Sequence, residues 1–396
     1  MFKAFIAGAV RTPVGNFNGS LSQLSATRLG AIVIEEAVKR SGIKSGSVDS
    51  VFMSSALPAG QGAAPARRST LEAGIPSSVK TALLTGGPSS SLLAVLFAFA
   101  EVSSGESDTV IAGGMESVSR APYLLDKARF GYRHGNGELI DSIINDGLRD
   151  SYGGFYIGES AETVAARHAV GREEQDLWAQ TSSSRAIESQ KNGAFDAEIA
   201  PIMIPVGPDK FASVNSDEGP HKHETLRLST VPSLFKDGGT VTSGNSSGVS
   251  DGAAAVAVVS ERAVKRYGLA PSVRITGGAC FGADPEMFSV APAEAIKKLL
   301  KKTGLKVRDI DLFEINEDFA ASTVAIMKET GIDGERLNVA GGAIALGNPL
   351  GASGARVLTT LVHAMRSRGA KRGVAAASSV GGEAVALLVE SVDGSL

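Results

Sequence analysis

The residues best placed to do chemistry lie in a glycine-rich stretch late in the chain. Residues 341–356 read GGAIALGNPLGASGAR, in which five glycines and Pro349 let the backbone turn tightly and bring its amides close to a ligand. Apolar residues at helical spacing follow over 356–365, so the turn leads into a buried helix. Such a turn can present a catalytic group, but the side chain it presents is Asn348, which cannot act as a base near neutral pH. The stretch therefore predicts a reaction site that has lost its reagent.

Serines offer two candidate nucleophiles, and neither has the partner that serine chemistry needs. Residues 89–91 are three serines after Pro88, but no histidine is placed to activate them, so we expect them to cap the helix that begins there. Residues 244–248 match the hydrolase pattern G-x-S-x-G, yet a strand-like run over 253–259 follows in place of the helix that such an elbow requires. A serine hydrolase is not expected.

No metal site is predicted from the sequence. His221 and His223 are close together, but no carboxylate or cysteine stands near them at ligand spacing, so a solvated loop is the favoured interpretation. The only cysteine, Cys280, lies in a strand-like segment that is remote in sequence from the glycine-rich stretch. A single cysteine excludes disulfides within the chain and indicates a reducing compartment.

Length and composition describe an ordinary globular protein. The chain has 396 residues, of which 43% are apolar and 20% charged. Its net charge of −3 gives no reason to expect nucleic acid or an anionic membrane as a partner. The longest apolar run, Leu92–Ala100, is far shorter than the roughly 20 residues that a membrane span needs. Because the N-terminus also has no signal-peptide pattern, we expect a cytoplasmic, soluble protein.

Two parts of the sequence resemble each other, which predicts a duplicated domain. Gly42 and Gly304 each end a helix-like segment that precedes a strand-like one, and Ser91 and Ser353 repeat the same offset along the chain. Each half reads strand, helix, strand, glycine-rich turn, buried helix and strand, which indicates buried sheets flanked by helices. The rhythm breaks over residues 119–249, which we interpret as loops and helices inserted into the first half.

Motifs along nearly the whole chain resemble the thiolases, specifically the biosynthetic acetoacetyl-CoA type (acetyl-CoA acetyltransferases). The motifs are RTPVG at 11–15, PAR at 65–67, AGGMES at 112–117, TVTSGNSSG at 240–248, NEDF at 316–319 and the glycine-rich stretch at 341–356. The resemblance implies an α/β thiolase fold, in which two duplicated halves form a five-layer α-β-α-β-α arrangement with an inserted loop domain. It also implies a homo-dimer or homo-tetramer. The expected divisions are an N-terminal half over 1–118 continued over 250–265, a loop domain over 119–249, and a C-terminal half over 266–396.

By this resemblance, the reacting groups of a thiolase are replaced in this chain. Thiolases work through an acyl-enzyme on a cysteine that a histidine activates, while a second cysteine moves the proton at the acyl acceptor. The resemblance puts Pro88 at the nucleophile's position, Asn348 at the histidine's and Ser378 at the second cysteine's. Asn316 keeps the asparagine of one oxyanion site, but Asp318 replaces a small apolar neighbour. Since losing an interdependent nucleophile and base can cost on the order of 10⁶ in rate, thiolase turnover is predicted to be absent.

The positions that contact CoA in this family match the family pattern more closely than the positions of the reacting groups do. Those that fall where the family contacts pantetheine and acyl groups are Leu148, Phe235, Ser243, Ser247 and Phe319. Tyr156 and Ile157 replace a His-Met pair that lines the same channel, and the bulk of Tyr156 is expected to narrow it. Asp318 is expected to weaken binding of a thioester enolate.

We interpret the chain as a catalytically degenerate thiolase-like protein. It binds CoA or an acyl-CoA, or it serves as the partner subunit of an active thiolase-fold enzyme, and it requires no cofactor. Two alternatives stay open. One is an acyltransferase or retro-aldolase that bypasses cysteine and uses Asp318, Tyr156 and Asn316. The other is a structural scaffold whose pocket is closed.

Overall fold

Strands of the first half form a mixed sheet in the computed structural model, which describes residues 2–220 and 227–392. The strands are β1 (Ala4–Arg11), β2 (Gly15–Asn16), β3 (Ser50–Ser55), β4 (Lys80–Thr85), β5 (Thr109–Ser117) and β10 (Ser250–Ser260). The helices are α1 (Ala26–Ser41), α2 (Pro65–Glu72), α3 (Ser89–Ser104) and α7 (Glu261–Tyr267). β3 pairs in parallel with β4 and β5, whereas β10 pairs antiparallel with β5 and β1.

The second half repeats this plan. Its strands are β11 (Val273–Gly282), β12 (Leu312–Ile315), β13 (Arg372–Ser379) and β14 (Glu383–Ser391). Its helices are α8 (Ala291–Thr303), α9 (Ala320–Thr330), α10 (Ala343–Leu346) and α11 (Ser353–Arg368). Gly42 ends α1 at φ 79° and Gly304 ends α8 at φ 72°, a left-handed conformation that glycine adopts without steric cost. The predicted duplication is confirmed by these paired elements.

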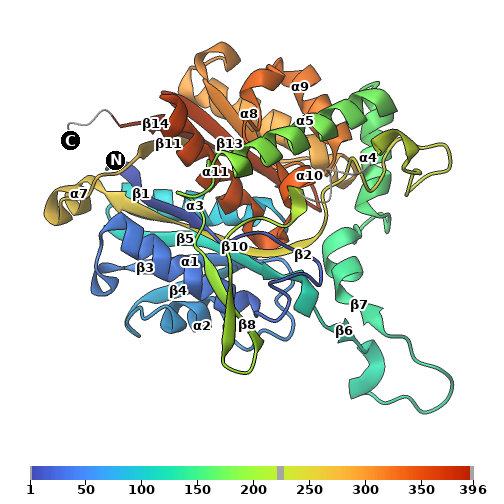
Figure 1. Ribbon diagram of the computed structural model, residues 1–396, viewed down its shortest axis with the longest axis horizontal. Helices are drawn as coiled ribbons and strands as arrows, with labels where there is room; N and C mark the ends of the chain where they lie inside the picture. Colours follow the sequence, from blue (N-terminus) through green and yellow to red (C-terminus); the bar gives the residue numbers. More distant parts are fainter. Residues whose placement is uncertain (1, 221–226, 393–396) are drawn as a thin grey trace.

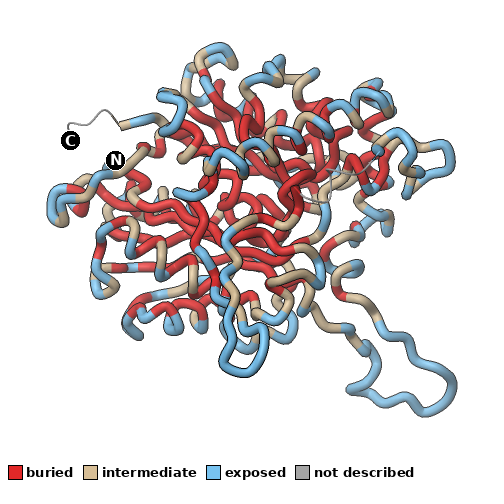
Figure 2. The backbone as a smooth tube through the Cα atoms, viewed as in Figure 1, coloured by how far each residue is buried: buried red, intermediate tan, exposed pale blue. Residues whose placement is uncertain are grey.

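Five layers result, with α3 and α11 in the middle (Figure 1). α1 and α2 cover the outer side of the first half's strands, and α8 and α9 cover the outer side of the second half's. One large buried cluster draws on α3, α11 and strands of both halves, so the two halves share this core (Figure 2). β1 also pairs antiparallel with β11, which joins the strands of the halves into one hydrogen-bonded path. The α-β-α-β-α arrangement that the sequence predicted is thereby confirmed.

The segment between β5 and β10 lies outside the paired strands of the first half. The chain returns to those strands at β10, which pairs with β5. Its elements are β6 (Tyr123–Leu124), β7 (Ile140–Asp141), α4 (Ile157–Arg167), α5 (Arg172–Lys191), β8 (Ile202–Gly207) and β9 (Lys210–Val214). Buried Arg11 of β1 binds this segment. Its Nε lies 2.6 Å from Glu198 Oε1, and its Nη1 and Nη2 lie 2.6 and 2.9 Å from the two carboxylate oxygens of Asp217.

α3 and α11 approach each other closely at their N-terminal ends. A Cβ atom on Gly354 would lie 2.5 Å from the carbonyl oxygen of Pro88 and 2.9 Å from the amide nitrogen of Leu92. Only glycine fits at position 354, which explains why this position of the glycine-rich stretch 341–356 holds a glycine. Within the described ranges, no helix is both long and apolar enough to cross a membrane.

Candidate functional site

Pro88 lies at the N-terminal tip of α3 and lines a small cavity between the inserted segment and both halves. Its φ of −56° fits the first turn of a helix, and its ring leaves the tip without one N–H donor. The cavity measures about 40 Å³, and Phe288, Leu350 and Val380 form part of its wall. That volume holds roughly three water molecules, so a longer ligand arm enters only if side chains move.

The three serines after Pro88 do not cap their own helix, which corrects the prediction made for them. The Oγ of Ser379, on β13, accepts a hydrogen bond from the backbone N–H of Ser89 at 3.1 Å and also bonds the Ser89 hydroxyl at 2.6 Å. Ser91 Oγ accepts instead from the N–H of Ala355, in the first turn of α11, at 2.9 Å. Each helix start is thus capped from another element, which sequence neighbours cannot reveal.

Hydrogen bonds to residues of several segments hold the backbone and the side-chain amide of Asn348 in place. Its backbone N–H donates to Gly248 O at 2.9 Å, and its Oδ1 accepts from Ser353 Oγ at 2.5 Å. Its Nδ2 lies 3.2 Å from both Ser247 Oγ and Asp318 Oδ1. The preceding Gly347 has a φ of 105°, which an L side chain rarely adopts. The amide is therefore held as a hydrogen-bond donor that faces Asp318.

Asp318 is the one carboxylate that lines this cavity in the described chain. Its Oδ1 accepts from Asn316 Nδ2 at 2.9 Å as well as from Asn348 Nδ2. Burial in this setting raises its pKa from 3.8 to about 7, although the hydrogen bonds from Asn348, Ser378 and Asn316 act in the opposite direction. A carboxyl group with a pKa near neutrality can take up or release a proton at physiological pH.

Two buried polar side-chain atoms near Asp318 make no hydrogen bond of normal geometry to the described residues. Ser378 Oγ is close enough to lower the pKa of Asp318 but makes no hydrogen bond of normal geometry to any described residue. Asn316 Oδ1 is likewise buried without a hydrogen-bond partner in the ranges that the structure describes. Buried polar atoms are almost always paired, and these two lie beside Asp318, which lines the cavity, although their own residues do not line it.

Glu317 positions the segment that carries Asn316 and Asp318, and sequence reasoning missed it. Its carboxylate accepts from Trp178 Nε1 at 3.1 Å and Ser182 Oγ at 2.8 Å, both on α5, and from Asn338 Nδ2 at 2.8 Å. These bonds hold Glu317 outside the cavity, whereas the next residue, Asp318, lines it and accepts a hydrogen bond from Asn316. The only sequence signal was its place inside the NEDF motif.

Glu116 positions the glycine-rich turn in the same way, and it was also missed. Its carboxylate accepts from the backbone N–H groups of Ala56 at 2.7 Å and Gly351 at 2.9 Å, and from Ser55 Oγ at 3.0 Å. Burial raises the pKa of Glu116, and these hydrogen bonds lower it in part. The AGGMES motif contains this residue, but its spacing does not reveal what the carboxylate holds.

The predicted binding residues are only partly brought together. Those that line the cavity with Pro88 and Asn348 are Leu148, Ile157, Ser247, Asp318 and Phe319. Phe235 lies behind them, with its ring edge-on to that of Phe319 at 6.4 Å between centroids. Ser243 and Tyr156 are exposed and do not line the cavity, and Arg149 stacks over the Tyr156 ring. Tyr156 therefore does not narrow the space in front of Pro88.

A larger groove of about 460 Å³ adjoins the cavity. The two share Gly87, Gly147, Leu350 and Val380 as lining residues. The groove also carries charged side chains, Arg149 among them. A ligand that reaches Pro88 thus has a polar space beside it.

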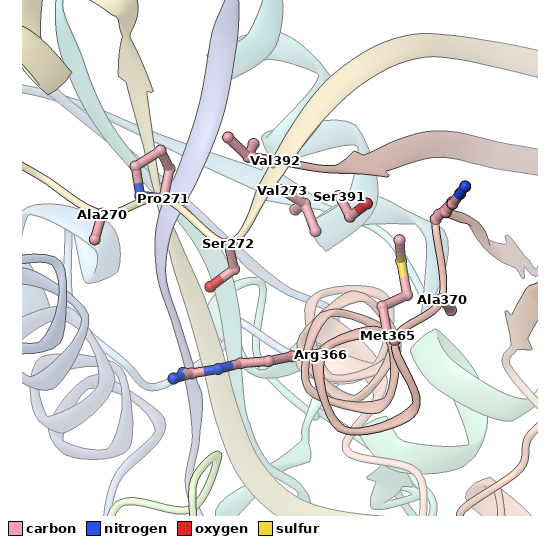
Figure 3. Close-up of a pocket in the computed structure, with 11 residues that line it drawn as sticks. Ala270, Pro271, Ser272, Val273, Met365, Arg366, Ala370, Ser391 and Val392 are labelled. Atoms are coloured by element: carbon pink, nitrogen blue, oxygen red, sulfur yellow. The ribbon is translucent and has the colours of Figure 1, made fainter. Parts of the chain in front are cut away.

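A separate pocket of about 460 Å³ lies at the far end of α11 (Figure 3). Arg366 extends from α11 at one side of it, and Ser272 and Ser391 lie on neighbouring strands or loops. Its described lining holds no carboxylate, histidine or cysteine, so it offers no general base. It shares no residue with the cavity at Pro88.

Neither Cys280 nor any described histidine lines the cavity at Pro88. Cys280 lies on β11, as its strand-like segment predicted, and burial raises the pKa of its thiol. His363 bonds the backbone oxygen of Ala9 at 3.0 Å through Nε2. Residues 2–220 and 227–392 contain no cluster of ligands suited to a metal ion. His221 and His223 lie outside the described residues.

Known proteins match this chain over nearly its whole length. Residues 4–262 match the family described as thiolase, N-terminal domain, and residues 269–391 match thiolase, C-terminal domain. An acetyl-CoA acetyltransferase of Chromobacterium violaceum is 43% identical, covering 97% of this chain and 98% of that protein. One of Schizosaccharomyces pombe is 41% identical, covering 98% and 99%. The crystal structure of the Bacillus anthracis acetyl-CoA acetyltransferase superposes with a TM-score of 0.96 at 36% identity, covering 99% of each chain. Two family matches, close relatives and a shared fold together establish that this chain belongs to the thiolase family.

Proposed function

We propose that this thiolase-family chain binds a CoA thioester with a small acyl group and forms no acyl-enzyme. The observation that carries the proposal is Pro88 on the cavity wall at the tip of α3. Proline has neither a nucleophilic side chain nor an N–H, and the resemblance assigns the family's nucleophilic cysteine to this position. The relatives named acetyl-CoA acetyltransferase support a CoA thioester as the ligand class.

The remaining groups do not replace the lost reagents. Asn348, at the position that the resemblance assigns to the activating histidine, has its amide tied to Asp318, Ser247 and Ser353. Ser378, at the second cysteine's position, lies beside Asp318 but carries a hydroxyl, which ionises far less readily than a cysteine thiol. General acid–base groups supply about 10²–10⁴-fold and one oxyanion donor about 10²–10³-fold, so their joint loss leaves no useful thiolase turnover.

Two assays on the purified protein test this proposal. Thermal unfolding with increasing CoA and acetyl-CoA should show a rising melting temperature, because a ligand that binds only the folded state stabilises it by about 2.7 kcal/mol at 100 times its Kd. CoA-dependent cleavage of acetoacetyl-CoA should not exceed the rate without protein. Measurable cleavage would show an active thiolase, and a melting temperature that no CoA species raises would favour the closed scaffold.

Asp318 supports a second candidate function, which is proton transfer without covalent catalysis. Its pKa of about 7 and its place on the cavity suit a general acid or base. A retro-aldol cleavage fits: Asp318 takes the hydroxyl proton of a 3-hydroxyacyl thioester, the bond between the second and third carbons breaks, an aldehyde leaves, and the same proton returns to the thioester enolate. Release of an aldehyde that Asp318→Ala abolishes would establish this activity.

We also propose that the chain assembles as a homo-oligomer. β4 is the terminal strand of the sheet path, and its outer edge has no strand beside it in the described chain. Free strand edges are commonly covered by a neighbouring chain. An active thiolase-fold protein is the alternative partner. Light scattering of the purified chain, alone and with such a protein, distinguishes a self-association from a mixed complex.

A further inference from the structure

Hydrogen-bond donors at the cavity are already occupied by the protein's own carboxylate. The side-chain amides of Asn316 and Asn348 both donate to Asp318 Oδ1, at 2.9 and 3.2 Å. Pro88, at the helix start, has no N–H to offer. The groups that could receive a carbonyl oxygen or an oxyanion are therefore committed to Asp318, and its negative charge repels a second anion.

Acceptors, in contrast, are left over at the same place. Both amides donate to Asp318 Oδ1, and the other carboxylate oxygen, Oδ2, receives neither of these bonds. Asn316 Oδ1 is buried, with the residue 4% exposed, and it lacks a described donor. Ser378 Oγ, on a residue 1% exposed, lies close enough to Asp318 to lower the pKa of that carboxyl but makes no hydrogen bond of normal geometry to the described residues. Leaving buried acceptors unpaired costs more than a normal hydrogen bond gains, so a ligand that supplies a donor here is favoured.

We propose that this cavity selects a CoA thioester whose acyl group carries a hydroxyl next to the thioester, with that hydroxyl donating to Asp318. The inference rests on the proposed function, since the CoA arm must bind first. It adds the class of acyl group, a small hydroxyacyl group in preference to an alkyl acyl or an enolate. The small cavity, about 40 Å³, limits the acyl group to a few atoms.

A matched pair of thioesters tests the selection directly. Glycolyl-CoA and propionyl-CoA differ only in a hydroxyl against a methyl group at the same position, so their shapes are alike. Titration calorimetry at about pH 8 should show glycolyl-CoA binding roughly tenfold more tightly to the wild-type chain, the effect expected of a hydrogen bond to a charged group.

Three variants assign the preference to Asp318. Asp318→Ala removes the carboxylate and frees both amides, so the ratio of the two dissociation constants should fall to about one. Asp318→Asn keeps the shape and removes the charge, so it should reduce the ratio even if the alanine variant fails to fold. Asp251→Asn is the control, because Asp251 is also a buried carboxylate with a raised pKa but lies outside the cavity. It should leave the ratio unchanged.

Each outcome separates the inference from the function on which it rests. Tight binding of both thioesters with equal affinity, or a preference for propionyl-CoA, overturns the inference and leaves the proposed function standing. A hydroxyl preference that survives in both Asp318 variants also overturns it. Failure of CoA and of both thioesters to bind the wild-type chain contradicts the proposed function and the inference together.

Discussion

Asp318 ionises among amides and hydroxyls, which makes the stability of the fold depend on pH. Burial raises its folded-state pKa from 3.8 to about 7, so the folded chain holds this proton more tightly than the unfolded chain does. The free energy of unfolding therefore falls as the pH rises between these two values and stays low above them. Burial of Glu314 raises its pKa to about 8 and extends the same trend.

Replacing Asp318 by asparagine should remove most of the loss of folding stability that the ionisation of Asp318 causes as the pH rises. We expect Asp318→Asn to raise the free energy of unfolding at about pH 8 by on the order of 1–3 kcal/mol and to change it little at about pH 4, close to the pKa of the unfolded chain. The new amide oxygen can still accept from Asn316 and Asn348, so the packing is kept. Urea unfolding at both pH values measures the difference, and an equal change at both would contradict the ionisation argument.

A second prediction at the scale of single residues concerns Pro88. Pro88→Cys places a thiol and an N–H at the start of α3, where a helix N-terminus lowers a thiol's pKa. Incubation with acetyl-CoA should then give one acetyl adduct by intact-protein mass spectrometry, whereas the wild type gives none. Cys280 is the internal control, because it is an exposed thiol on β11 that does not line the cavity and partial burial raises its pKa. An adduct that maps to Cys280, or none on the new thiol, would count against a helix tip poised for acyl transfer.

At the scale of the elements, the crossing of α3 and α11 is the tightest constraint on the site. Gly354→Ala brings a methyl group to 2.5 Å from the Pro88 carbonyl oxygen, which is backbone and cannot swing aside. Overpacking of this kind costs about 1–3 kcal/mol. Gly46→Ala is the matched control, since no described atom lies within 4 Å of its new methyl group. Equal melting temperatures for the two variants would show that the crossing adjusts freely.

Local sequence signals predicted the elements well, and they did not predict the contacts between them. The glycine stops at Gly42 and Gly304 follow from short-range spacing. The bond from Ala355 N to Ser91 Oγ joins residues 264 apart, and the bond from Ser89 to Ser379 joins residues 290 apart. Spacing carries no information about such partners. The capping prediction for the serines failed for this reason.

For the candidate site, the family resemblance identified Pro88, Asn348 and Asp318. Of the other residues that line the cavity it named Leu148, Ile157, Ser247 and Phe319, and it did not name Phe288 or Leu350. It did not find Glu116 or Glu317, because a buried carboxylate that orders backbone amides looks like any other acid in sequence. It also could not show that Asp318 accepts hydrogen bonds from both amides. That property depends on two segments, 316–318 and the turn at Asn348, meeting in space.

At the scale of the molecule, the two halves share one core and the inserted segment extends from it. Figure 2 shows an exposed loop over residues 125–139 that projects from the buried interior. Brief trypsin treatment should cut first at Lys127, Arg129 or Arg133, which are exposed. The cut chain should still elute as one species, since β5 and β10 remain paired and α3 and α11 bind both halves. Early cleavage elsewhere, or separation of the pieces, would contradict a single shared core.

The central claim is that a CoA thioester binds this chain without forming a covalent bond to it. Equilibrium dialysis with radiolabelled acetyl-CoA, followed by acid denaturation of the retained protein, tests both parts in one sample. We expect the radiolabel to be bound to the protein at saturation and to be released entirely when the protein is denatured. Label that stays attached to the protein after denaturation, or no label bound at any concentration, would contradict it.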